Sequence, residues 1–273
     1  FGVQLFGRTL FPRWYRKYRE KFTDIVAPAV ATNMTIDEMT ANEDTKLGLA
    51  LSEQVSTLEA ALRTIGLTSN LARLVLVCGH GSSSDNNPFE AALHCGACGG
   101  HPGKANARVF ASIANKAEVR AQLANKGIVI PEDTHFIAGL HDTTTDAVVI
   151  FDQEDIPATH QEDIARLTEG LRDAAVRTNQ ERCARLPLVK KDPSPERVER
   201  EIQRRAGDWS EVRPEWGLSG NAAFIIGSRE LTRQIDLKGR VFLNNYDYRG
   251  DSSLSLIHIS EPTRPLYISY AVF

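Results

Sequence analysis

The sequence predicts an α/β domain with a mostly parallel sheet flanked by helices. Apolar stretches of strand length alternate with longer segments that carry apolar residues at helical spacing. The apolar run at 74–78 ends abruptly in Gly79, His80 and Gly81, as a buried strand does where it reaches the edge of an open sheet. Alternation of strands and helices is typical of parallel sheets, because each crossover between parallel strands usually contains a helix.

The helices and strands expected from these periods follow one another along the chain. Residues 47–67 have apolar side chains at helical spacing and end at Gly66, which predicts an amphipathic helix packed on a strand at 71–78. Residues 107–125 predict a second helix, ended by Gly127. The remaining expected elements are strands at 134–140 and 147–151, helices at 161–186 and from Pro195, and a strand, a helix and a strand at 222–226, 229–235 and 240–244.

Composition limits the classes of function. The net charge of -3 gives no overall attraction to nucleic acid, so we expect no nucleic-acid partner. No apolar run approaches the roughly 18 to 20 residues of a membrane-spanning helix, so we expect any membrane role to come from docking on a membrane protein. Three of the four cysteines lie close together, which favours a metal site or reactive thiols in a reducing compartment over a disulfide framework.

A cluster of metal-binding residue types lies directly after the strand expected at 71–78. His80 comes at the edge of the sheet, where open α/β folds place their ligands, and the Gly-rich segments around it allow close backbone turns. Thiolate and imidazole groups are ligands that zinc prefers, so the cluster indicates a metal site. Its members are Cys78, His80, His94, Cys95, Cys98 and His101.

These residues, together with later motifs, resemble the DabA family, the large subunits of bacterial inorganic carbon transporters. The resemblance covers most of residues 50–250. It rests on motifs in the same order and spacing, namely Gly79-His80-Gly81-Ser82, Asn86-Asn87-Pro88, Cys95-Gly96-Ala97-Cys98-Gly99-Gly100, Asn106-Ala107-Arg108, His141-Asp142-Thr143-Thr144-Thr145-Asp146 and Arg213-Pro214-Glu215-Trp216-Gly217.

The resemblance implies a β-carbonic-anhydrase-like fold with a zinc centre that hydrates CO2 to bicarbonate. It maps two zinc ligands onto His80 and Cys95. The family's Cys-x-Asp pair, with an Arg two residues after the Asp, has no counterpart here, because neither Cys78 nor Cys183 begins such a motif. We therefore expect this chain to carry half of the zinc site on an incomplete fold, and to be inactive by itself.

The same resemblance implies a place at the membrane. Members of the family are expected to be peripheral subunits on the cytoplasmic side of the inner membrane. There they dock on an antiporter-like, proton-conducting membrane subunit of the DabB type, which makes hydration directional. We therefore expect a Zn2+ cofactor, CO2 and bicarbonate as substrate and product, and a membrane partner of this type.

Other side chains are candidates for the surroundings of the metal. Ser82, Asn87 and Cys98 are expected to hold the Gly-rich loop, to pack beside the metal or to orient its imidazole ligand. His141 and Asp146 follow an expected strand, so they also lie near an edge of the sheet. For this last segment two interpretations stay open: a polar turn that caps a helix, and a wall of the pocket or a path for protons.

Two rival functions are compatible with the same residues. In a zinc-dependent hydrolase, Glu90 would act as acid or base in a substrate groove, whereas a carbonic-anhydrase centre needs only a small apolar pocket for CO2. In a structural zinc-binding interaction module, a closed Cys2His2 site would bind zinc without residues from elsewhere. The ligands of that closed site would be His80, Cys95, Cys98 and His101.

The two ends of the chain are expected to differ from its middle. The chain begins with Phe1 and an aromatic, basic segment without the features of a signal peptide, so we expect a C-terminal-half fragment of a longer protein, with residues 1–46 belonging to its upstream part. Residues 47–253 are expected to form the partial zinc-binding α/β domain. Residues 254–273 resemble translated sequencing-adapter read-through, so we expect a non-native tail whose deletion leaves the fold unchanged.

Overall fold

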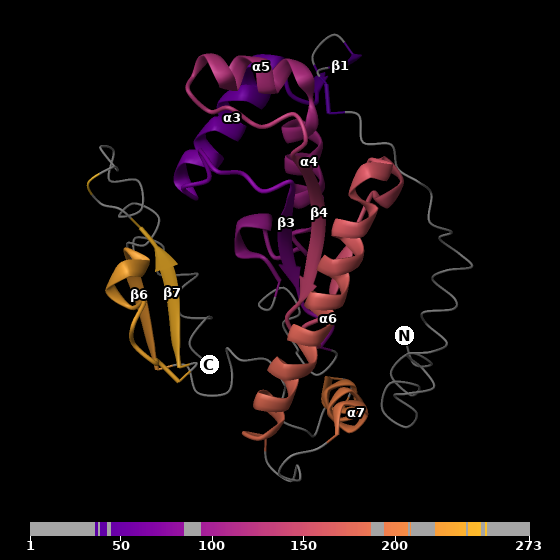
Figure 1. Cartoon of the computed structure of the whole chain (residues 1–273), viewed down its shortest axis with the longest axis vertical. Helices are drawn as coiled ribbons and strands as arrows, with labels where there is room; N and C mark the ends of the chain where they lie inside the picture. The colour runs from indigo at the N-terminus through magenta and orange to yellow at the C-terminus, as the bar shows by residue number, and fades with distance from the viewer. Residues whose placement is uncertain are drawn as a thin grey trace. The chain divides into compact units, whose positions relative to one another are not determined.

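A computed structural model of the chain (Figure 1) describes residues 36–37, 39–42, 45–84, 94–186, 194–206, 208, 222–238, 240–246 and 249. The chain divides into two compact units, Phe1–Arg213 and Pro214–Phe273. Residues 1–35 and the whole tail at 254–273 lie outside the described residues. The boundaries expected at 46 and 253 therefore stay predictions.

Strands and helices alternate in the described part of the first unit, as the sequence predicts, so the chain is a mixed α/β protein. In chain order its elements are β1 (Met39–Asn42), β2 (Thr45–Leu47), α3 (Leu51–Thr64), β3 (Leu74–Gly81), η2 (Gly96–Cys98), α4 (Lys104–Asn115), α5 (Ala117–Asn125), β4 (His135–Asp142), β5 (Val148–Ile150), η3 (Gln153–Asp155), η4 (Ala158–His160), α6 (Gln161–Cys183) and α7 (Pro195–Ala206). The second unit contains β6 (Ala223–Gly227), η6 (Arg229–Leu231) and β7 (Val241–Asn245).

Strands β3, β4 and β5 form the sheet that carries the candidate site. Their order is β3-β4-β5, with β3 parallel and β5 antiparallel to β4. The parallel pairing runs from Leu74 opposite His135 to Gly81 opposite Asp142, and the crossover through α4 and α5 connects the two strands. The expectation of a parallel sheet is thus confirmed for β3 and β4, whereas β5 is an outer strand antiparallel to β4.

Helices cover both faces of this sheet. Successive side chains of β4 point to opposite sides, and each side packs against helices. Phe136 and Ala138 join a core cluster with residues of α3, α4 and α5. Ile137 points the other way, where Ile164 and Leu167 of α6 belong to its cluster. Figure 1 shows α6 running along β3 and β4. The sheet is therefore the middle layer of three.

Two of the expected helices have different bounds in the structure. The helix expected at 47–67 begins only at Leu51, because residues 45–47 form β2 in a hairpin with β1. The helix expected at 107–125 is two helices, α4 and α5, since Lys116 leaves helical geometry with a ψ of 129°. Arg120 stabilises this break by donating hydrogen bonds to the backbone oxygen of Ala114 (2.7 Å) and the side chain of Asn115 (3.0 Å).

The second unit contains a parallel pair of strands, as the sequence predicts. Strands β6 and β7 pair from Ala223 opposite Val241 onward. The helix expected between them at 229–235 is limited to the 3-10 turn η6. The Ser228 hydroxyl accepts a hydrogen bond from the backbone nitrogen of Glu230 at 3.3 Å, so a side chain forms the tight turn at its start.

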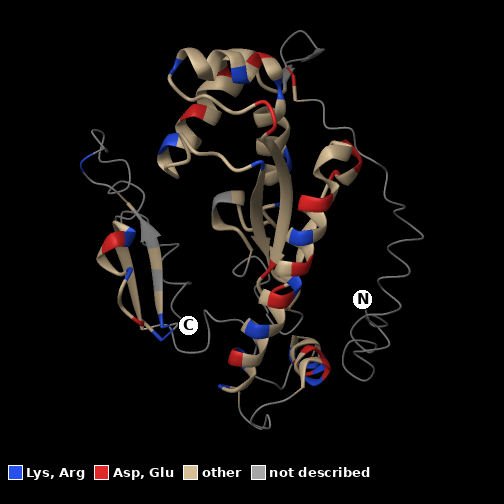
Figure 2. Cartoon of the chain, in the orientation of Figure 1, with Lys and Arg blue, Asp and Glu red and all other residues tan. Residues whose placement is uncertain are grey.

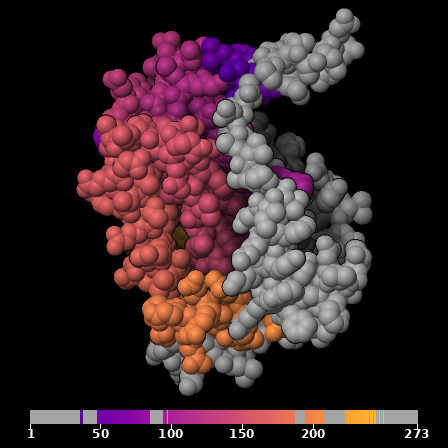
Figure 3. All heavy atoms as spheres, turned by 90° about the vertical axis from the view of Figure 1, so that its right-hand side faces the viewer, coloured from indigo at the N-terminus to yellow at the C-terminus, as the bar shows by residue number. Residues whose placement is uncertain are grey.

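Helix α7 packs on the C-terminal end of α6. Val198 and Ile202 of α7 are buried in one cluster with Cys183 and Leu186. Acidic and basic residues alternate along both helices (Figure 2), and both helices reach the surface in the space-filling view of Figure 3. Within the described part of the chain, no helix combines the length and the apolar character needed to cross a bilayer.

Replacing Glu201 by glutamine should destabilise the protein at neutral pH and have little effect in acid. The Glu201 carboxylate accepts hydrogen bonds from Arg204 (2.7 Å) and from the buried Arg205 (2.8 Å). Arg204 first, and then Arg205, hold the pKa of Glu201 below its ordinary value of 4.5. Their contribution, about 1.5 to 3 kcal/mol for a bond to a charged group, is therefore present above that ordinary value and is lost as the pH falls through the lowered pKa.

Thermal unfolding of both proteins at neutral pH and at about pH 3 measures this difference. Glu230→Gln is the matched control, because Glu230 and its partner Arg233 are both largely exposed. Exposed ion pairs contribute only about 0 to 1 kcal/mol. Equal losses for the two variants at neutral pH would contradict the role assigned to Glu201.

Candidate metal centre at the ends of β3 and β4

His80 lies near the carboxyl end of β3, next to His141 of β4. The two residues are Cα partners in the parallel ladder, so their side chains project from the same face of the sheet. By the alternation along β3 this is the α6 face, on which Leu74 and Leu76 lie. Loss of hydration, with contributions from His141 and His94, lowers the pKa of His80 and favours the neutral imidazole that binds a metal.

The cysteines lie on a loop that returns to the end of β3. Cys95 and His101 form an isolated β-bridge, in which the Cys95 nitrogen donates to the His101 oxygen at 3.2 Å. The Gly103 nitrogen then donates to the His80 oxygen at 2.8 Å. Gly79 lies so close to this loop that a Cβ atom on it would be 2.5 Å from the Gly103 oxygen. The absence of a side chain at Gly79 is therefore what lets the loop approach the strand.

The side chains of Cys95 and Cys98 are neighbours. The nearby Cys95 thiol, with a smaller contribution from lost hydration, raises the pKa of Cys98. The side-chain nitrogen of Asn106 also donates to the Cys98 sulfur at 3.2 Å. Both cysteines are free of disulfide bonds. Two adjacent thiols are a chemically suitable ligand pair for zinc, which binds the deprotonated form.

Strand alternation separates the two halves of this candidate site. Gly79 and Gly81 face Gly103 and Pro102 of the cysteine loop, whereas His80, between them, points to the α6 face. Among the described residues, no group of three or more His, Cys, Asp or Glu side chains is placed to hold a metal ion. The donor types fit zinc, but the described residues do not complete a site. The assignment of His80 and Cys95 as ligands stays a prediction.

Asp142 connects the loop after β3 to the turn after β4. Its carboxylate accepts hydrogen bonds from Ser83 N (2.9 Å) and Oγ (2.7 Å), Thr144 N (3.1 Å) and Thr145 Oγ1 (2.6 Å). The Ser82 hydroxyl lies 2.8 Å from Thr144 Oγ1 and accepts a hydrogen bond from the Ser84 backbone nitrogen at 3.2 Å. Ser82 therefore makes hydrogen bonds within the loop and to the turn after β4, while Asp142 connects the two strand ends.

The segment that ends in Asp146 forms the turn between β4 and β5. The strand β5 follows it directly, so the interpretation as a helix cap is wrong. Asp146 Oδ1 lies 2.9 Å from His141 Nε2, and Arg182 Nη2 donates to Asp146 Oδ2 at 2.5 Å. Asp146 has a φ of 59°, in the left-handed region that residues other than glycine rarely adopt.

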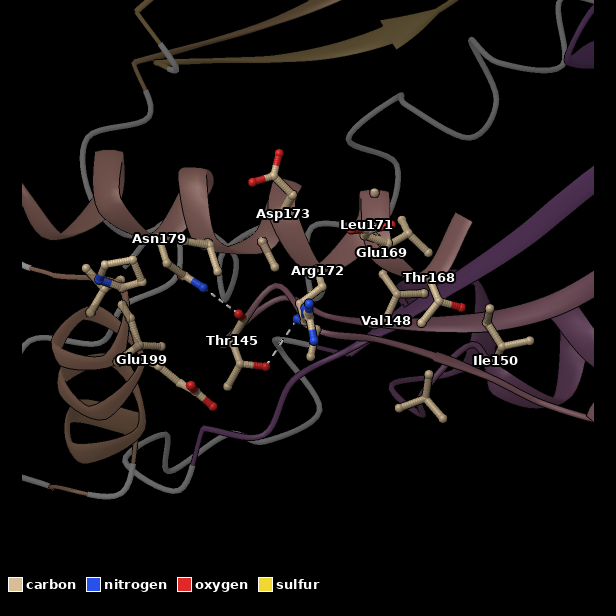
Figure 4. Close-up of a pocket in the computed structure, with 18 of the residues that line it drawn as sticks. Thr145, Val148, Ile150, Thr168, Glu169, Leu171, Arg172, Asp173, Asn179 and Glu199 are labelled. Atoms are coloured by element: carbon tan, nitrogen blue, oxygen red, sulfur yellow. Dashed lines mark hydrogen bonds between the residues drawn. The ribbon is translucent and has the colours of Figure 1, made fainter. Parts of the chain in front are cut away.

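A separate cavity of about 1210 Å³ lies between β5, α6 and α7 (Figure 4). Val148, Ile150 and Leu171 give it an apolar lining, and charged residues of α6 also line it. Asn179 and Thr145 lie in its wall, where the Asn179 side chain donates to the Thr145 oxygen at 2.6 Å. The cavity therefore borders the turn that holds Asp146.

Two residues at this sheet edge were not expected to matter from the sequence. Asp142 had a local signal, because an Asp before a run of Thr favours hydrogen bonds to its own turn. Arg182 had none, since it lies on a strongly charged helix whose arginines are expected to be solvated. Asn87 and Glu90, which sequence reasoning did single out, lie outside the described residues.

The fold and the site define an α/β domain in which one edge of a sheet gathers histidine and cysteine side chains. Residues 1–259 match the family model described as "Probable inorganic carbon transporter subunit DabA". The chain belongs to this DabA family.

Several curated relatives share the name "Probable inorganic carbon transporter subunit DabA". The relative from Chloroflexus aggregans is 49% identical over 213 residues, which cover 78% of this chain and 25% of the relative. The Geobacillus thermodenitrificans relative is 45% identical over 252 residues (92% and 29%), and that of Legionella pneumophila strain Lens is 42% identical over 256 residues (94% and 32%). The chain thus spans about a quarter to a third of their length. No solved structure matches it.

Proposed function

We propose that this chain supplies part of the zinc centre of an energy-coupled inorganic carbon transporter, where CO2 is hydrated to bicarbonate. Its membership of a family named for inorganic carbon transport carries the proposal. The histidine and cysteine side chains at the edge of the sheet support it by their chemistry. The β-carbonic-anhydrase-like fold is part of the same proposal.

In this centre His80 and Cys95 would hold zinc together with donors from outside the described residues. Bound zinc supplies the Lewis acidity that activates water toward CO2. The lowered pKa of His80 keeps its imidazole neutral, as a ligand must be. Because strand alternation directs His80 and the cysteine loop to different faces, sharing one ion requires the His80 side chain to turn at the strand end.

Hydration of CO2 releases one proton for each bicarbonate formed. We propose that an antiporter-like, proton-conducting membrane subunit of the DabB type removes this proton and so makes the reaction directional. The chain would then work as a peripheral subunit on the cytoplasmic side of the inner membrane. The name of its relatives, transporter subunit, supports the presence of further subunits.

A hybrid transporter tests this proposal. The matching segment of the Geobacillus thermodenitrificans relative is replaced by that of this chain, and the hybrid is produced with the relative's own membrane partner in cells that depend on inorganic carbon uptake. Accumulation of labelled bicarbonate and the zinc content of the purified hybrid are measured. We expect stoichiometric zinc and uptake in the hybrid, and loss of both to background in His80→Ala and Cys95→Ser.

Variants of the same loop provide the matched controls. His101→Ala and Cys98→Ser remove the same side-chain types from positions that the family pattern does not use, and we expect them to retain zinc and measurable uptake. A hybrid without zinc and without uptake would overturn the proposed function. Equal loss of zinc in all four variants would overturn the ligand assignment alone.

A structural zinc module is the second candidate, because two observations favour it. The Cys95 and Cys98 side chains are neighbours, and Cys95 pairs with His101 in the bridge of the loop. A closed Cys2His2 site with His80 would retain zinc in this chain alone against a nanomolar chelator. The half-site proposed above should lose it, since zinc sites normally use three or four protein ligands.

A further inference from the structure

We propose that Arg182 of α6 is a positioning residue that fixes the imidazole of His141 beside His80. It acts through Asp146, which contacts both Arg182 and His141. The expected effect of Arg182 on transport rests on the function proposed above. The expected tautomer of His141 rests only on the contacts at this end of the sheet.

The Arg182 side chain is 2% exposed, which is unusual for a group that carries a permanent charge. Such burial is tolerated only when a partner charge and hydrogen bonds replace the lost water. Here Nη2 donates to the Asp146 carboxylate, and Nη1 donates to the backbone oxygen of Thr144 at 2.8 Å. The planar guanidinium thus donates from two nitrogens at once, to the carboxylate and to the backbone of one turn. A lysine has a single nitrogen and lacks this fixed fork of donors.

Asn179 adds a second contact from the same side of α6. It precedes Arg182 by three residues, a spacing that places both side chains on one face of the helix. Its side chain donates to the backbone oxygen of Thr145 (Figure 4). Two residues of α6 therefore hold consecutive carbonyl groups of the turn, at Thr144 and Thr145.

Asp146 transmits this restraint to His141. Its left-handed backbone is strained for a residue with a side chain, and such strain persists only where the surroundings over-determine it. With one carboxylate oxygen bound to Arg182, the other accepts a hydrogen bond from His141 Nε2 at 2.9 Å. A neutral His141 is therefore held as the Nε2–H tautomer, which leaves the lone pair on Nδ1.

His141 brings this fixed imidazole to the candidate site. It is the Cα partner of His80, and both side chains project from the α6 face at the end of the parallel pair. The Asp142 network holds the loop after β3 to the same turn. We infer that the chain of contacts Arg182–Asp146–His141 presents one defined hydrogen-bond acceptor next to the proposed zinc ligand, and that α6 is what defines it.

The test follows the nitrogen resonances of the imidazole groups in the chain labelled with 15N-histidine. In the unchanged chain we expect a single Nε2–H tautomer for His141. Arg182→Gln should give a mixture of tautomers, and its hybrid transporter should lose roughly 10- to 100-fold in uptake, the usual effect of removing the residue that orients a site histidine. Arg182→Lys should not restore the tautomer, because lysine keeps the charge and loses the fork.

Arg177→Gln is the matched control on the same helix. Arg177 is 76% exposed and pairs with the exposed Asp173, so its loss should change neither the tautomer nor uptake. If Arg182→Gln fails to fold, as its thermal unfolding would reveal, Asp146→Asn replaces it. Asparagine also adopts the left-handed backbone. This variant removes the negative charge and replaces one of the two acceptor oxygens by an NH2 donor, so Arg182 and His141 can no longer both donate to residue 146.

A His141 tautomer that stays unchanged in Arg182→Gln or in a folded Asp146→Asn would overturn the proposal. Equal losses of uptake in Arg177→Gln and Arg182→Gln would also overturn it, because they would show general damage to α6. The tautomer is measured without zinc and without transport. If the hybrid that carries the unsubstituted segment takes up no bicarbonate, the proposed function is contradicted. The imidazole spectra of the chain still decide the role of Arg182.

Discussion

Replacing Phe136 by alanine should destabilise the first unit by about 3 to 5 kcal/mol, the range for removing a buried aromatic side chain. Phe136 is 1% exposed and belongs to the core cluster shared by β4 and the helices α3, α4 and α5. Its ring lies 6.2 Å from that of Phe110, so the substitution also removes an aromatic contact. Urea unfolding, followed by far-UV circular dichroism, measures the change.

Phe224→Ala provides the control for this prediction. The same substitution is made at a residue of β6 that is 60% exposed, so we expect a change below about 0.5 kcal/mol. A loss for Phe136→Ala as small as the one expected for Phe224→Ala would mean that Phe136 does not lie in the core of the first unit.

Replacing Gly79 by alanine should destabilise the protein by about 1 to 3 kcal/mol, the usual cost of overpacking. The new methyl group would lie 2.5 Å from the Gly103 oxygen, so the cysteine loop must move away from β3. We also expect bicarbonate uptake by the hybrid transporter to fall, because this loop carries Cys95 and bonds to His80. Thermal unfolding and uptake are the two measurements.

Gly170→Ala is the control with the opposite sign. Gly170 lies within α6, and a Cβ atom there would meet nothing within 4 Å. Alanine favours the helix over glycine by about 0.5 to 1 kcal/mol, so this variant should be more stable than the unchanged chain. A stabilising effect of Gly79→Ala as well would show that the loop does not approach β3 as closely as the structure has it.

The central strands could be predicted because their signals are local. The apolar run of β3 ends at Gly79-His80-Gly81, and the strand ends there in the structure. The end of β4 was expected at residue 140, whereas the strand continues to Asp142. Those last residues are polar and pair with His80 and Gly81, so their conformation depends on a contact that the local pattern does not contain.

Contacts between distant segments explain what the sequence could not predict. The end of α4 is fixed by Asn115, whose side chain exchanges two hydrogen bonds with the backbone of Phe136 at 2.8 and 3.0 Å. The burial of Arg182 likewise depends on a turn nearly forty residues before it. For the site, the sequence predicted which residue types gather at the sheet edge, and the structure adds how Asp142, Asp146 and Arg182 hold them.

The parallel pairing of β3 with β4 also determines when the site forms during folding. Leu74 meets His135 only across the whole crossover through α4 and α5, so their pairing must close a long loop before any ladder contact stabilises it. Helices such as α3 and α6 depend on neighbours in sequence and form on a much shorter timescale. We therefore expect His80 and His141 to become neighbours in a late step of folding, and a chain that has formed only its helices to lack a site that could bind a metal ion.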